Sequence, residues 1–97
     1  MTAKQTMLYI IRSNVEEIER FGVKRIGFFG SFAHGEAQKK SDVDILVEFK
    51  QGLKTYNNYM ELKFFLESLF HRKVDLVIKE AIKPRIRHRI LKEVIYA

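Results

Sequence analysis

Apolar and polar positions follow helical spacing over three stretches of this 97-residue chain. From Lys4 to Phe21, apolar residues recur every three or four positions, which predicts a first helix with Asn14 as the one polar member of its stripe. The same spacing predicts a helix over 56–70, capped by Thr55. It also predicts a last helix that begins at Pro84 and carries Ile95 on its apolar side.

Short apolar runs separate these helices and predict strands. They cover 23–29, 42–49 and 72–79, and a short helical turn over 31–34 follows the first of them. The resulting order is α-β-α-β-α-β-α. Such alternation indicates an α/β (α+β) fold with a small sheet flanked by helices.

Length and composition indicate how many domains the chain forms and in which cellular compartment it is expected. Apolar residues make up 46% of the 97 positions, which is enough for a core, and we expect a single domain over residues 1–97. The chain has no cysteine, which excludes disulfides and zinc–thiolate sites. Because no apolar run reaches the roughly 18 residues of a membrane span and no signal-peptide core is visible, we expect a cytoplasmic protein.

The charge balance favours an anionic partner. The formal net charge is +6 and the sequence pI is about 9.7, which suits a nucleotide, a nucleic acid or an acidic protein surface. In the last helix, Arg85, Arg89 and Lys92 share one face, which is either a docking surface for an acidic partner or RNA, or a solvated face opposite the apolar stripe.

Two aspartates stand at the start of the second predicted strand. Asp42 and Asp44 are two residues apart and therefore share a strand face, which Leu46 and Glu48 continue. Neighbouring carboxylates repel each other, and a hard cation such as Mg²⁺ or Mn²⁺ relieves that repulsion. An ordinary half-exposed acidic strand face remains the alternative.

Two further features belong to the same pattern. Asp75 interrupts the apolar run of the third strand, and it reaches the aspartate pair if that strand lies beside the second. Gly30 permits close backbone approach to a ligand, and Ser31 starts a turn whose free N–H groups suit a phosphate. A simple turn with Ser31 as its N-cap is the alternative. Glu36 replaces the lysine that a P-loop requires.

Taken together, these residues resemble a known family. The stretch GSFAHGEAQKKSDVDILVEF, followed by VDLVIKEAIKPRIRHRILKEVIYA, is similar to the minimal nucleotidyltransferase (MNT) family of the DNA polymerase β-like superfamily, from about Arg25 onward. The resemblance implies a nucleotidyltransferase fold with a mixed three-stranded sheet, whose first two strands are antiparallel.

The resemblance also implies roles for individual residues. Asp42, Asp44 and Asp75 would hold two Mg²⁺ ions, or Mn²⁺, while Gly30 and Ser31 would hold the nucleotide triphosphate. The reaction implied is the transfer of AMP from ATP to a hydroxyl. Family members commonly carry arginine where this chain has His34, which puts the strength of phosphate binding in question.

The resemblance finally implies a partner. Family members of this size commonly act as antitoxins of a HEPN-domain RNase toxin, in characterised cases by adenylylating a tyrosine of the toxin. Neutralisation by binding alone, or nucleotidyl transfer to RNA or a small molecule, stays open as an alternative, and direct nucleic-acid binding is not favoured.

Overall fold

The computed structural model describes residues 1–38 and 40–97. None of the helices that these residues form is long and apolar enough to cross a membrane. In chain order the elements are α1 (Ala3–Ser13), α2 (Val15–Glu19), β1 (Val23–Phe29), α3 (Ser31–His34), β2 (Val43–Phe49), α4 (Tyr56–Phe70), β3 (Val74–Ile78), the 3-10 turn η1 (Lys79–Ala81), α5 (Pro84–Glu93) and β4 (Ile95–Tyr96).

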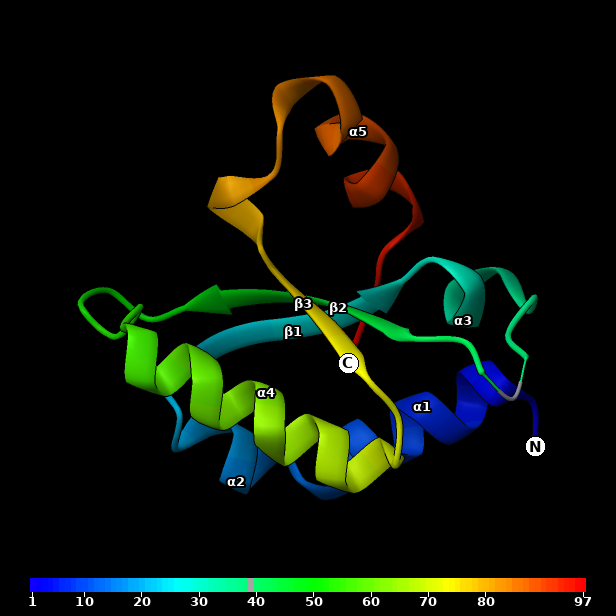
Figure 1. The fold of residues 1–97 in the computed structure, drawn as a ribbon, viewed down its shortest axis with the longest axis horizontal. Helices are drawn as coiled ribbons and strands as arrows, with labels where there is room; N and C mark the ends of the chain where they lie inside the picture. The colour runs from blue at the N-terminus through cyan, green and yellow to red at the C-terminus, as the bar shows by residue number, and fades with distance from the viewer. Residues whose placement is uncertain (39) are drawn as a thin grey trace.

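The strands form one mixed sheet in the order β3-β2-β1-β4. β1 pairs antiparallel with β2 and with β4, whereas β2 and β3 are parallel. Figure 1 shows α1, α2 and α4 on one side of the sheet and α5 on the other. The predicted α/β fold, the mixed sheet and the antiparallel first pair are confirmed.

The predicted number of strands is wrong, because β4 adds a fourth. Ile95 pairs with Phe28, and Tyr96 pairs with Gly27. The sequence had placed Ile95 on the last helix, but α5 ends at Glu93 and the chain then extends along β1. A Cβ at Gly27 would lie 2.7 Å from the carbonyl oxygen of Ile95, so only glycine lets the two backbones approach this closely.

The predicted first helix is interrupted at Asn14. The Asn14 side-chain nitrogen donates a hydrogen bond to the carbonyl oxygen of Ile10 at 2.8 Å, and the Asn14 backbone leaves the helical region at φ −119° and ψ 20°. A polar side chain that bonds to the preceding turn competes with helix continuation. α1 and α2 therefore replace one continuous helix.

Each face of the sheet has its own core. Beneath α4 and α1, a large cluster includes Ile45, Leu76 and Leu62. On the α5 side, a smaller cluster joins Phe29 and Leu46 of the sheet to Ile82 and Ile90. Leu46, on the same strand face as Asp44, is fully buried there, which explains why that face is not uniformly polar.

Candidate functional site

Asp44 and Asp75 lie side by side on two parallel strands. The register of β2 and β3 pairs Asp44 with Asp75. Their following residues, Ile45 and Leu76, pack into the core beneath α4, so the two aspartates project to the opposite face, where α5 lies. The structure therefore brings these two predicted site residues together.

Asp42 stands just before β2, which begins at Val43 and not at Asp42 as the pattern predicted. Its side chain is exposed, and its charge contributes to the electrostatic environment of Asp44. The loop before the strand, rather than the strand itself, thus presents the first aspartate of the pair.

Gly30 lies directly against the Asp44 carboxylate. The antiparallel pairing of β1 with β2 sets Phe29 opposite Asp44, so the residue that follows Phe29 reaches the start of β2. Gly30 has φ +71°, and a Cβ built on it would lie 2.1 Å from Asp44 Oδ2. Both the backbone conformation and the close approach require glycine at this position.

The turn α3 follows immediately. Gly30 is its N-cap, so Ser31 is the first helical residue and not the cap, as the sequence had suggested. Among the described residues no side chain caps this turn, and Gly35 ends it at φ +74°. Phe32 and Ala33 are buried, which fixes the turn against the sheet. Ser31 is half-buried at the end of β1 that lies next to Asp44.

The carboxylates act on one another. The pKa of Asp44 is raised from 3.8 to about 6, first by burial and then by the negative charges of Asp75, Asp42 and Glu93. Burial disfavours the ionised carboxylate, and each neighbouring carboxylate adds repulsion. The charge of four acidic side chains is thus concentrated at one end of the sheet.

This donor set fits a hard divalent cation. Carboxylate oxygens are the ligands that Mg²⁺ and Mn²⁺ prefer, and a cation relieves the repulsion that raises the pKa of Asp44. Within residues 1–38 and 40–97, no three acidic or histidine side chains already converge on one point.

Glu93 is a residue that sequence reasoning missed. It is the last residue of α5, and its carboxylate Oε2 contacts Nε2 of His34 at the end of α3. The signal in the sequence is slight: Glu93 is the only acidic residue in an otherwise basic helix, PRIRHRILKE. The contact joins the C-terminal helix to the glycine-serine turn.

Arg72 contacts both the loop before Asp42 and the turn α3. Its Nη1 donates to the carbonyl oxygens of Gln38 at 2.8 Å and Ser41 at 3.0 Å. Its guanidinium also lies 5.2 Å from the centre of the Phe32 ring in α3. One arginine thus connects the start of β3, the Asp42 loop and the turn that begins at Ser31.

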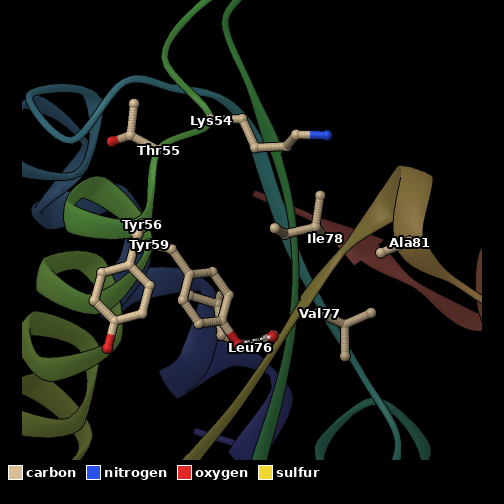
Figure 2. A pocket seen from close by; sticks show the side chains of 8 residues that line it. All are labelled: Lys54, Thr55, Tyr56, Tyr59, Leu76, Val77, Ile78 and Ala81. Carbon is tan, nitrogen blue, oxygen red and sulfur yellow. Dashed lines mark hydrogen bonds between the residues drawn. The ribbon is translucent and has the colours of Figure 1, made fainter.

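A separate apolar hollow of about 540 Å³ lies along β3, between the start of α4 and η1. Figure 2 shows Tyr56, Tyr59 and Leu76 on its walls, with the Tyr59 hydroxyl donating to the Leu76 carbonyl oxygen at 2.6 Å. None of the predicted site residues lines it. The acidic cluster and this hollow are therefore different places on the molecule.

The sequence is similar to known nucleotidyltransferases. A family model described as a nucleotidyltransferase domain matches residues 8–97. The chain is 44% identical over 88 residues to the protein adenylyltransferase MntA of Thermococcus cleftensis, an alignment that covers 90% of this chain and 88% of that protein.

Solved structures agree with the fold. A structure described as a minimal nucleotidyltransferase superposes with a TM-score of 0.80 at 35% identity, covering 98% of this chain and 95% of that one. The MNT antitoxin in complex with the tri-AMPylated HEPN toxin of Shewanella oneidensis gives a TM-score of 0.59 at 19% identity, over 99% of this chain and 71% of that one. The second likeness concerns the fold alone.

Proposed function

Because the chain belongs to the nucleotidyltransferase family and, within it, to the MntA-like protein adenylyltransferases, we propose that it transfers AMP from ATP to a tyrosine hydroxyl of a HEPN-type RNase toxin. In doing so it acts as the antitoxin of that toxin. The observation that carries the proposal is the position of Asp44, which lies beside Asp75 and against Gly30.

In this proposal Asp42, Asp44 and Asp75 hold Mg²⁺, with two ions fitting the number of carboxylates and Mn²⁺ as a substitute. The bound metal supplies charge neutralisation for the triphosphate and activation of the attacking hydroxyl. Gly30 lets the triphosphate approach the backbone, and the Ser31 hydroxyl with the adjacent amides of α3 donates hydrogen bonds to its phosphate oxygens.

The chemical step forms a bond between the acceptor oxygen and the α-phosphorus and breaks the bond from that phosphorus to pyrophosphate. Asp75 is exposed at the face where an acceptor arrives, so its carboxylate takes the proton that the hydroxyl loses. Asp44 is half-buried beside it on β2, and its contact with Gly30 keeps the carboxylates next to the phosphate turn.

The partner is proposed from the structural neighbours. An MNT protein of the same fold is seen in complex with a tri-AMPylated HEPN toxin. This chain has a net charge of +6, which favours association with an acidic surface. A HEPN toxin with a tyrosine near an acidic docking surface is the acceptor that meets both conditions.

The test is co-expression of the chain with the candidate HEPN toxin, followed by intact mass measurement of the toxin. We expect a mass gain of one or more AMP units that requires Mg²⁺ and disappears with Asp44→Ala or Asp75→Ala. Glu61→Ala, which removes an exposed carboxylate on α4, is the matched control and should leave the gain intact. Full modification by both aspartate variants contradicts the proposal.

Two other outcomes separate the alternatives. If an Asp42→Asn/Asp44→Asn variant still protects cells from the toxin, neutralisation proceeds by binding alone. If labelled ATP marks RNA or a small molecule in the reaction and leaves the toxin unmarked, the acceptor is not the toxin.

A further inference from the structure

The contact between Glu93 and His34 joins two parts of the chain that are distant in sequence. Glu93 closes α5, and His34 closes α3, the turn that opens at Ser31. Their side chains meet through Glu93 Oε2 and His34 Nε2, with 19% of the Glu93 side chain and 51% of the His34 side chain exposed. The more buried partner is therefore the glutamate.

The backbone that follows fixes Glu93 in place. After Val94, Ile95 and Tyr96 pair with β1, and the amide of Ala97 donates to the carbonyl oxygen of Ile26 at 3.0 Å. The guanidinium of Arg25 lies 3.5 Å from the centre of the Tyr96 ring. Because β1 also leads into Gly30, Glu93 is anchored to the strand from which α3 departs.

α3 needs such an anchor. It has four residues, and a single helical turn does not persist by its own hydrogen bonds. Its start is held by the close fit of Gly30 against Asp44, and its middle by the burial of Phe32. At its end, the described residues supply one side-chain partner for His34, and that partner is Glu93.

We propose that Glu93 is a positioning residue for nucleotide binding: by holding His34 it fixes the end of α3, so that Ser31 and the neighbouring amides face the triphosphate. In this role His34 acts as the partner of Glu93 and not as a phosphate ligand. The inference rests on the proposed function, because it assigns residues to the same nucleotide site.

The sign of the effect distinguishes positioning from simple electrostatics. Glu93 is negative and close enough to Asp44 that its charge helps to raise the pKa of that carboxyl. On charge alone, removal of Glu93 should strengthen the binding of an anionic triphosphate. Positioning predicts the opposite, because an unanchored turn must be ordered when the ligand binds.

The experiment is calorimetric titration of the full chain with α,β-methylene ATP and Mg²⁺, which measures affinity without a protein acceptor. We expect Glu93→Ala and His34→Ala each to weaken binding about tenfold, and the double variant to bind no more weakly than either single one, because the two residues act as a pair. Glu93→Gln, which keeps a hydrogen-bonding group while losing the charge, should bind within about twofold of wild type.

Glu61→Ala removes an exposed carboxylate elsewhere and is the control for the change in net charge. Melting temperatures of all variants are measured beside the titrations, and Glu93→Gln keeps the comparison interpretable if Glu93→Ala folds poorly. A merely structural role lowers the melting temperature without producing the paired, non-additive loss of affinity.

The outcomes separate the two claims. If wild-type protein binds and Glu93→Ala binds equally tightly or more tightly, or if the losses in the double variant multiply, the positioning role is overturned while the proposed function stands. If wild-type protein binds no nucleoside triphosphate, the proposed function is overturned and this inference with it.

Discussion

The carboxylate of Asp44 occupies the space that any side chain at residue 30 would need. A Cβ at Gly30 would lie 2.1 Å from Asp44 Oδ2 and 3.1 Å from its carboxyl carbon. This fit connects the requirement for glycine in the turn to the presence of an acid on the neighbouring strand. A substitution at Gly30 therefore displaces the Asp44 carboxylate, and a substitution at Asp44 changes the space available at Gly30.

Gly30→Ala should destabilise the protein strongly. The backbone at φ +71° and ψ −144° lies in a region that essentially only glycine adopts and costs an alanine about 1–3 kcal/mol. The contact with Asp44 adds a further cost. Gly52→Ala is the matched control, because Gly52 has φ +81° with no atom within 4 Å of its Cβ position. Urea denaturation should show a larger loss for Gly30→Ala, and adding Asp44→Ala should recover part of it. Equal losses at the two glycines contradict the contact.

Asp44→Asn should stabilise the metal-free protein at pH 7.5. Since the folded pKa of about 6 lies above the ordinary pKa of 3.8 for an aspartate, folding favours the protonated acid, and wild-type stability falls as pH rises from about 4 through 6. The neutral amide avoids that loss. The shift corresponds to about 3 kcal/mol, which screening of a half-exposed group reduces to about 1 kcal/mol.

The check is thermal unfolding of both proteins in EDTA at two pH values. A gain of about 1 kcal/mol at pH 7.5 corresponds to about 4–8 °C in a domain of this size, and it should vanish at pH 3.5, where wild-type Asp44 is protonated. Adding Mg²⁺ at pH 7.5 should stabilise wild type more than Asp44→Asn. An equal gain at both pH values would show that the effect does not come from ionisation.

Gly27→Ala should loosen the C-terminal strand. The added Cβ would meet the Ile95 carbonyl oxygen at 2.7 Å and Val94 Cγ2 at 3.0 Å, which forces β4 away from β1. We expect faster hydrogen exchange at the amide of Ala97, which donates to Ile26, while the amides of β2 keep their protection. Exchange that rises equally in β2 would indicate global destabilisation and contradict a local effect.

Arg72→Lys should disorder the approach to Asp42 without removing a charge. Lysine lacks the planar fork by which the guanidinium bonds the carbonyls of Gln38 and Ser41 and faces the Phe32 ring. We expect a loss of about 1–2 kcal/mol in stability and lower AMP transfer. Arg89→Lys, on the exposed face of α5, is the control and should change neither quantity.

Much of the site was predictable because its residues are marked by local contrast. Asp75 interrupts an apolar strand, and Gly30-Ser31 stops another, so each stands out from its neighbours. Their meeting then follows from strand pairing, since β2 lies between β1 and β3. Glu93 carries no such contrast, because an acidic residue on the polar side of a helix is ordinary until the fold shows that His34 faces it.

The two wrongly predicted helix boundaries have the same cause. At each one, a hydrogen bond competes with continuation of the helix, and the spacing of apolar residues does not reveal that bond. Asn14 continues the spacing of the first helix, yet its side chain bonds the preceding turn and the helix breaks. Ile95 continues the spacing of the last helix, but it pairs with Phe28, which is distant in sequence, and therefore lies in a strand. In both cases a hydrogen bond outside the hydrophobic pattern decides the boundary.

The place of β4 also sets an order of events during synthesis. β1 is made early, and its second edge is not covered until Ile95 and Tyr96 emerge. The three aspartates are present as soon as residue 75 has been made, whereas Glu93, which contacts His34 at the end of α3, is made 18 residues later. A chain synthesised only to residue 75 thus contains the three aspartates without the residue that anchors the end of α3, and β1 gains its second paired neighbour only after Ile95 and Tyr96 have been made.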